Sequence, residues 1–232
     1  MDVIKINRSE LKYLLSWHEA VSLQNELSSL LVKDPHSKSG AYPVRSLYFD
    51  SFSNQDYYEK LAGIEKRKKV RIRIYHPDDI QGKFEIKQKD GNYSHKRSLS
   101  ISKDEIIKSI NCDYSFLLNH NSQEAFKLYS ILTLNYYTPK AIIEYQRNAF
   151  IYPENNIRIT FDSSIKSAEF QHDLFSKSLD WRSIDDSTVI LEVKFNGQLY
   201  QPISAILQKY HLDQISVSKY TIGRPLYTNC FY

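Results

Sequence analysis

The sequence is poor in glycine, proline and cysteine and has no long apolar run. Its 232 residues include six glycines, seven prolines and two cysteines, which excludes collagen-like and low-complexity chains. Cys112 and Cys230 are far apart and fit no metal-binding spacing, so we expect reduced thiols in an intracellular protein. No stretch approaches the ~18 apolar residues of a membrane span, and the N-terminus lacks the apolar core of a signal peptide. We therefore expect a cytoplasmic protein.

Positive and negative charge nearly balance over the whole chain. The formal net charge of +4 is too small to indicate a nucleic-acid or membrane partner by itself. The length and the 41% of hydrophobic residues suit one large domain with its own core. Because no linker and no internal repeat interrupts the sequence, we predict a single domain over residues 1–232.

Hydrophobic periodicity predicts a chain of strands with interspersed helices. Strands are predicted over residues 3–15, 43–50, 66–75, 83–89, 94–101, 139–150, 157–162 and 188–195. Capping boxes at Ser16–Glu19 and Ser102–Glu105 predict two helix starts. Further helices are predicted at 53–61, at 122–135 with Phe126 facing inward, and at 202–210. Residues 163–187 are expected to form an irregular excursion.

Charged side chains share one face of several predicted strands, because successive residues of a strand point to opposite faces. In residues 66–75, for example, aliphatic residues occupy one face and basic residues the other. The charged positions of this strand and four others are Arg67, Lys69, Arg71, Arg73, Lys83, Glu85, Lys87, Lys89, Lys96, Arg158, Asp162, Glu192 and Lys194.

A solvated polar face on a half-buried sheet is the simplest explanation of such alternation. However, like charges two residues apart repel each other, and a dense cationic face is best accommodated by a polyanion. We therefore predict an α+β fold: an antiparallel β-barrel of about eight strands with a charged interior, packed on the outside by helices.

Acidic residues also lie within the predicted strands, several beside a lysine on the same face. They are Glu10, Glu85, Glu144, Asp162 and Glu192. Carboxylates among phosphate-binding cations suggest a hard divalent ion, Mg²⁺ or Mn²⁺, that bridges carboxylate and phosphate oxygens. Simple Glu–Lys pairing is the alternative.

Short motifs recur in a fixed order along the chain. They are Arg8-Ser-Glu10-Leu-Lys12-Tyr13, Ser46-Leu-Tyr48-Phe49-Asp50, Arg71-Ile-Arg73-Ile-Tyr75, Glu85-Ile-Lys87, Lys96-Arg97, Tyr145-Gln-Arg147, Arg158-Ile-Thr-Phe161-Asp162, Leu191-Glu192-Val-Lys194 and Ser218-Lys219-Tyr220. Over about residues 5–225 the chain resembles the catalytic domain of the VTC polyphosphate polymerases, as a stand-alone member of bacterial type. That domain belongs to the wider group of triphosphate tunnel metalloenzymes (CYTH-like).

The resemblance implies which residues would act. Lys12, Arg71, Arg73, Lys87 and Glu192 would be catalytic. The phosphate chain would be held by Lys12, Lys60, Arg71, Arg73, Lys87, Lys96, Arg147, Arg158, Lys194 and Lys219. The metal, Mn²⁺ or Mg²⁺, would be held by Glu192, helped by Glu10, Glu85 and Glu144. Glu144 and Arg147 have opposite strand parity, so either a bulge intervenes or one of the two points outward.

The resemblance further implies that ATP donates its γ-phosphate to inorganic phosphate or to a growing polyphosphate chain. Hydrolytic members of the wider group open with Glu-x-Glu-x-Lys, whereas here Arg8 replaces the first acid, which favours the polymerase. An inorganic or nucleoside triphosphatase and a non-catalytic polyphosphate- or nucleotide-binding module are the alternatives. No P-loop and no nucleic-acid motif occur. We expect no nucleic-acid partner and no membrane insertion, although a separate membrane partner stays open.

Overall fold

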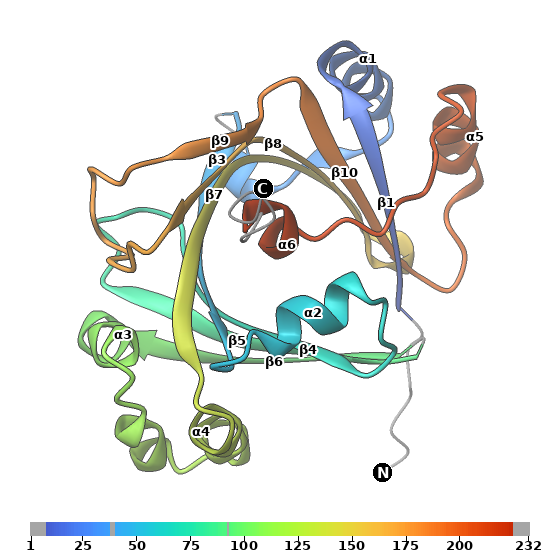
Figure 1. Ribbon diagram of the computed structural model, residues 1–232. Helices are drawn as coiled ribbons and strands as arrows, with labels where there is room; N and C mark the ends of the chain where they lie inside the picture. The colour runs from blue at the N-terminus through green and yellow to red at the C-terminus, as the bar shows by residue number, and fades with distance from the viewer. Residues whose placement is uncertain (1–7, 38–39, 92, 225–232) are drawn as a thin grey trace. The chain divides into compact units, whose positions relative to one another are not determined.

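The computed structural model describes residues 8–37, 40–91 and 93–224, and it combines a sheet with peripheral helices (Figure 1). The helices are α1 (Trp17–Ser28), α2 (Gln55–Leu61), α3 (Lys103–Ile110), α4 (Gln123–Leu134), α5 (Gln201–Lys209) and α6 (Lys219–Gly223). The strands are β1 (Arg8–Ser16), β2 (Val32–Lys33), β3 (Tyr42–Asp50), β4 (Arg67–Ile74), β5 (Gln81–Asp90), β6 (Tyr93–Ser102), β7 (Thr138–Tyr152), β8 (Ile157–Glu169), β9 (Arg182–Asp185) and β10 (Thr188–Asn196). The predicted start of the first strand, residues 3–7, and Cys230 lie outside the described residues.

The strands pair in the order β1-β10-β8-β7-β3-β4-β5-β6, with β2 added to β7 and β9 to β8. The registers resolved for β1–β10, β10–β8, β3–β4, β4–β5 and β5–β6 are antiparallel. The predicted α+β class with an antiparallel sheet of about eight main strands is confirmed. Among the described strands the hydrogen-bonded path is open, with β1 and β6 at its ends, so the ladder does not close into a ring.

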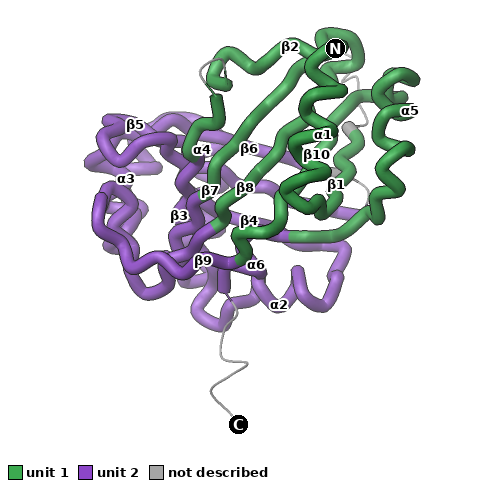
Figure 2. The backbone as a smooth tube through the Cα atoms, turned by 90° about the horizontal axis from the view of Figure 1, so that it is seen from above, with its two compact units in different colours: residues 1–43, 145–165, 185–217 green, residues 44–144, 166–184, 218–232 purple. Residues whose placement is uncertain are grey.

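The chain forms two compact units (Figure 2). Unit 1 comprises residues 1–43, 145–165 and 185–217, and unit 2 comprises residues 44–144, 166–184 and 218–232. Strands β7 and β8 contribute to both units. Because each unit is assembled from three separate segments, neither corresponds to a contiguous domain, and the single domain over 1–232 stays a prediction.

In unit 1, helices α1 and α5 cover the apolar side chains of β1, β8 and β10. Leu23 and Leu27 of α1 and Ile203 of α5 are fully buried against them. The capping box predicted at Ser16 is present and opens α1 directly after β1. The helix-covered positions of β8 and β10 include Phe161 and Val193, so the alternate positions of these strands carry the charged residues.

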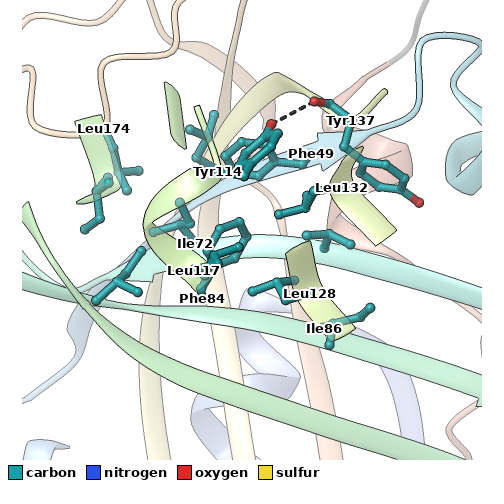
Figure 3. Packing of buried hydrophobic residues seen from close by; sticks show 14 of the residues in the cluster. Phe49, Ile72, Phe84, Ile86, Tyr114, Leu117, Leu128, Leu132, Tyr137 and Leu174 are labelled. Atoms are coloured by element: carbon teal, nitrogen blue, oxygen red, sulfur yellow. Dashed lines mark hydrogen bonds between the residues drawn. The ribbon is translucent and has the colours of Figure 1, made fainter. Parts of the chain in front are cut away.

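In unit 2, helices α3 and α4 cover the apolar face of β4 and β5, while α2 and α6 lie over the other face (Figure 1). Ile72, Phe84 and Ile86 point into a core with Leu117 and Leu132 (Figure 3). The Tyr114 hydroxyl donates a hydrogen bond to the carbonyl of Tyr137 inside this core at 2.7 Å. The alternation predicted for residues 66–75 thus separates an apolar face from a basic one.

Two expectations for the helices and loops were wrong. Phe126 is 63% exposed, and α4 instead buries Ala125, Leu128 and Leu132. Residues 163–169 continue β8, and β9 follows within the segment expected to be irregular. Ser164, with φ of 50°, interrupts the pleat of β8. Ile157, Ile159 and Phe161 before it belong to the core of unit 1, and Ala168 after it belongs to the core of unit 2.

Candidate functional site

The register of β4, β5 and β6 in unit 2 places basic residues directly opposite one another. Lys69 faces Lys87, and Lys87 faces Lys96. Directly opposite residues have Cβ atoms about 5 Å apart, and like charges there are destabilising. The neighbouring pairs Arg67–Lys89 and Arg73–Lys83 extend this pattern along the same face. We call the face that carries these rows and the Arg71–Glu85 pair the basic face.

Glu85 is the carboxylate that offsets the basic face, and it is 4% exposed. Its Oε2 lies 2.8 Å from Arg71 Nε and 3.5 Å from Arg73 Nη2, and its Oε1 pairs with Lys96. Burial alone would raise the pKa of Glu85, but Arg71, Arg73 and Lys96 lower it to about 2. Glu85 therefore stays ionised at neutral pH. It pairs with three predicted phosphate-binding residues, and the face keeps an excess of positive charge.

Helix α6 is seated on the basic face. Lys69 Nζ donates to Ser218 Oγ at 2.6 Å, and Ser218 is the N-cap of α6. The Tyr220 ring stacks on Tyr48, with centroids 5.0 Å apart and planes at 17°. Arg71 Nη1 donates to the hydroxyl of Tyr48 at 3.1 Å. These contacts bring Lys219, the first residue of α6, to the basic face.

The pKa of Tyr48 agrees with the position of Lys219 beside the basic face. Burial raises the pKa of its hydroxyl, but Arg71, Arg73 and Lys219 oppose this and leave the pKa below its usual value. A lowered pKa marks a positive local potential, because it favours the phenolate. Four of the predicted phosphate-binding residues of unit 2 (Arg71, Arg73, Lys87 and Lys96) lie on β4–β6, and Lys219 joins them through α6. Lys60 lies in the last turn of α2, half-buried.

Asp50 anchors both α2 and α6, a role that the sequence did not reveal. Its carboxylate is fully buried and accepts hydrogen bonds from the backbone N–H groups of Asp56 (2.9 Å) and Tyr57 (3.0 Å) and from the Tyr220 hydroxyl (2.7 Å). Ser51 N–H donates a further bond at 2.8 Å. The Ser46-Leu-Tyr48-Phe49-Asp50 motif signalled an acid at a strand end but not what it binds.

Unit 1 contains a second charged cluster, made by β1 and β10. Lys12 Nζ lies 3.2 Å from Glu10 Oε1 and 3.5 Å from Glu192 Oε1. Lys194 Nζ lies 3.1 Å from Glu192 Oε2. The register explains the grouping, because Lys12 faces Glu192 and Glu10 faces Lys194. Burial lowers the pKa of Lys12, but Glu192 and Glu10 outweigh it and leave that pKa above its usual value.

Arg147 extends the unit 1 cluster. Its Nε and Nη2 lie 2.7 and 2.8 Å from the two oxygens of Asp162, a bidentate pair, and its Nη2 lies 3.9 Å from Glu192 Oε2. Arg158 is placed elsewhere on β8. Its Nη1 lies 2.5 Å from Asp34 Oδ2, and its Nη2 donates to the hydroxyl of Tyr42 at 3.3 Å.

Glu144 belongs to a separate cluster in unit 2. It lies 2.5 Å from Arg45 Nε and 2.8 Å from Lys166 Nζ, and both cations lie over the Trp181 ring. Arg45 shares its side of β3 with Leu47 and Phe49, which are core residues. Glu144 is therefore away from the basic face. Glu144 and Arg147 are three residues apart on β7 and so point to opposite faces of the strand. No bulge is needed, because the two residues belong to different clusters and Arg147 pairs with Asp162 in unit 1.

The predicted metal ligands differ in their fit to a divalent ion. Glu10 and Glu192 converge on one ammonium and have the hard oxygen donors that Mg²⁺ and Mn²⁺ prefer. Glu85 pairs with Arg71, Arg73 and Lys96, and Glu144 pairs with Arg45 and Lys166, so these two acids lie in separate clusters and do not share a cation as Glu10 and Glu192 do. Within residues 8–37, 40–91 and 93–224, no group of three or more His, Cys, Asp or Glu side chains could hold a metal ion.

A family model for the VTC domain matches residues 7–227. The chain belongs to the VTC domain family. Among curated proteins, no sequence matches this VTC domain. In the part of the chain that the structure describes, no helix has both the length and the apolar character needed to cross a membrane.

Two solved structures with a similar fold are distantly related to this chain in sequence. A proposed adenylate cyclase from Bacillus halodurans is 14% identical, with a TM-score of 0.52, over 92% of this chain and 96% of that one. A proposed adenylyl cyclase from Hippeastrum with a dominant triphosphatase activity is also 14% identical, with a TM-score of 0.51, over 93% of this chain and 94% of that one. These likenesses support the fold of the VTC domain.

Proposed function

We propose that this VTC domain is a polyphosphate polymerase, which transfers the γ-phosphate of ATP to inorganic phosphate or to a growing polyphosphate chain. The observation that carries the proposal is a row of three lysines across the basic face. Lys69 of β4, which lies between Arg67 and Arg71, faces Lys87 of β5, and Lys87 faces Lys96 of β6. Three lysines in cross-strand register repel each other, and a polyanion among them would relieve that repulsion. Membership of the VTC family makes a phosphate chain the polyanion that fits.

The residues of the basic face would make different kinds of contact with the phosphate chain. Arg71 and Arg73 present planar guanidinium forks, which suit bidentate contacts to phosphate oxygens, whereas Lys87 and Lys96 supply point charges. Phosphoryl transfer depends on positioning and charge stabilisation more than on a protein nucleophile. Lys219 would hold the chain from the side of α6. In unit 1, Lys12, Lys194 and Arg147 are the corresponding cations, and Arg158 is a weaker candidate because it lies apart from the Glu192 cluster, paired with Asp34.

Glu10 and Glu192 would hold the Mn²⁺ or Mg²⁺ ion, which would neutralise charge on the phosphate oxygens. Lys12 Nζ already pairs with both carboxylates, so its ammonium group would then contact the phosphate oxygens as well as the two acids. The presence of Arg8 in place of an acid leaves one carboxylate fewer for activating water. This favours a phosphate acceptor over water.

A triphosphatase is the second candidate. It would use the same cations, with water as the acceptor of the phosphoryl group. The dominant triphosphatase activity of the Hippeastrum protein, which shares the fold, is the observation that supports it.

Incubation of the purified protein with ATP and Mn²⁺ or Mg²⁺ tests these candidates. We expect a phosphatase-sensitive polyphosphate ladder on a gel. Free phosphate without a ladder would establish the triphosphatase, and unchanged ATP with tight tripolyphosphate binding would establish a non-catalytic module. Glu192→Gln should abolish turnover while the matched surface variant Glu154→Gln should not. Equal turnover in both variants would refute the role of Glu192.

A further inference from the structure

Two buried hydroxyl groups have no hydrogen-bond partner in the part of the chain that the structure describes. They are Oγ of Ser46 on β3 and Oγ1 of Thr160 on β8. Each lies directly opposite a predicted functional residue, since Ser46 faces Arg73 and Thr160 faces Glu192. A buried hydroxyl loses its hydrogen bonds to water on folding, and an unpaired one regains none of that free energy. Such groups are rare in native proteins and concentrate where a ligand binds.

Thr160 lies on the same face as the metal ligands proposed for unit 1. Lys12, Glu192 and Thr160 form one row across β1, β10 and β8. Directly opposite residues of an antiparallel pair share a face, with Cβ atoms about 5 Å apart. The residues on either side of Thr160 belong to the helix-covered core of unit 1, so the pleat directs Thr160 to the charged side. With 1% exposure, Thr160 is buried beside Glu192.

The charged groups around Thr160 pair with one another and not with its hydroxyl. Arg147 directs Nε and Nη2 to the two oxygens of Asp162, at 2.7 and 2.8 Å. Arg147 Nη2 is 3.9 Å from Glu192 Oε2, which is too long for a hydrogen bond. Lys194 Nζ pairs with the same Glu192 oxygen at 3.1 Å. A small polar group bound at Glu192 could therefore use the Thr160 hydroxyl as a partner.

A divalent ion would bring such a polar group to Glu192. No third His, Cys, Asp or Glu among the described residues joins Glu10 and Glu192 in a group that could hold a metal. Water and phosphate oxygens would have to complete the coordination of an ion there, and Mg²⁺ keeps several of its waters when it binds one or two carboxylates. In a buried site these waters need hydrogen-bond partners, and a threonine hydroxyl can donate to one or accept from one.

We propose that Thr160 is a positioning residue of the divalent-ion site, whose hydroxyl hydrogen-bonds a water bound to an ion on Glu192. This inference rests on the proposed role of Glu192 as a metal ligand. Groups that hold the ligands of a metal in place affect its affinity about 10–100-fold. In the absence of the ion the unpaired hydroxyl destabilises the fold, so binding of the ion and stability of unit 1 are coupled through Thr160.

Three variants of the full chain test the role of Thr160. Thr160→Val replaces the hydroxyl by a methyl group of similar size, and Thr160→Ser keeps the hydroxyl. The control Thr188→Val removes a hydroxyl from the other end of β10, where it donates to Asp185 Oδ2 at 2.8 Å. Electron paramagnetic resonance, which detects free Mn²⁺, measures Mn²⁺ binding without ATP. Thermal unfolding and calorimetric titration with tripolyphosphate, both in EDTA, measure stability and phosphate binding without metal.

We expect Thr160→Val to bind Mn²⁺ at least ~10-fold more weakly than the wild type. Thr160→Ser and Thr188→Val should stay within about twofold of it, because the first keeps the hydroxyl and the second lies away from the site. In EDTA, Thr160→Val should melt no lower than the wild type, since it removes a hydroxyl that has no partner, whereas Thr188→Val should melt lower. Tripolyphosphate affinity of Thr160→Val in EDTA should change less than about twofold.

Several results would overturn the role of Thr160 and leave that of Glu192 standing. They are unchanged Mn²⁺ affinity in Thr160→Val, an equal loss in Thr160→Ser, and a lower melting temperature of Thr160→Val in EDTA, which would show that the hydroxyl already has a partner in the protein. Weaker tripolyphosphate binding by Thr160→Val in EDTA would also overturn it, because the hydroxyl would then contact phosphate directly. A wild-type protein that binds Mn²⁺ no more tightly than Glu192→Gln would refute the proposed metal-binding role of Glu192 itself.

Discussion

Glu85→Gln is the most informative single substitution, because it removes the counter-charge of the basic face and preserves side-chain size. The pKa of Glu85 falls from the usual 4.5 to about 2, through its pairing with Arg71, Arg73 and Lys96. Each pKa unit corresponds to about 1.4 kcal/mol, so ionised Glu85 contributes about 3 kcal/mol to stability. The carboxylate is nearly fully buried, so solvent screening does not reduce this value much.

The sign of this contribution fixes its pH dependence. Since the pKa of Glu85 is lowered on folding, the stabilisation is complete above about pH 4.5 and is lost as the pH falls towards 2. In Glu85→Gln, three cations lose their shared partner. Urea unfolding at pH 7 should therefore show a loss of about 3 kcal/mol. The matched exposed variant Glu124→Gln should lose less than about 0.5 kcal/mol.

Added tripolyphosphate supplies the missing negative charge. We expect a larger ligand-induced rise in the melting temperature of Glu85→Gln than of the wild type, and tighter tripolyphosphate binding by titration. Two results would refute the reasoning. One is a stability loss no larger than that of Glu124→Gln, and the other is weaker tripolyphosphate binding by a folded Glu85→Gln protein.

Two further predictions concern the buried acids near α2. Asp50→Asn should lower the free energy of unfolding by about 2–4 kcal/mol, because backbone N–H groups of α2 lose a charged acceptor. Tyr220→Phe keeps the ring stack on Tyr48 and should lower it by about 1 kcal/mol. Equal losses of the two variants in urea unfolding would contradict this hydrogen-bond network. Burial and the neighbouring Asp50 raise the pKa of Asp56 to about 7 despite Lys68, so Asp56 should reduce stability progressively as the pH rises from about 4 to 7. Asp56→Asn should flatten that part of the stability profile, and an unchanged slope would show that Asp56 does not titrate there.

Local features of the fold were predictable because they depend on neighbouring residues. The capping boxes at Ser16 and Ser102 open α1 and α3 as predicted, and Gly63 follows α2 with the positive φ of 71° expected of a residue after a helix. The alternation in residues 66–75 correctly separated the helix-covered side of β4 from the side that carries Arg71 and Arg73.

Long-range features were not predictable from one sequence. The row Lys69–Lys87–Lys96 depends on the register of three strands, which periodicity alone does not fix. The family resemblance implied that Glu144 helps to hold the metal, but its pairing with Arg45 and Lys166 joins strands that are distant in the sequence. The hydrogen bonds of Asp50 likewise depend on how α2 and α6 pack, and no local motif specifies that packing.

The anchoring of α6 has a consequence for the order of events during synthesis. Asp50 and Tyr220 are separated by 170 residues, whereas the backbone groups of α2 that bind Asp50 follow it within seven residues. A nascent chain can therefore complete the local part of this network long before the ribosome supplies α6. Lys219 and Ser218 reach the basic face last. A growing chain thus acquires its full set of cations only after β4, β5 and β6 have had time to pair.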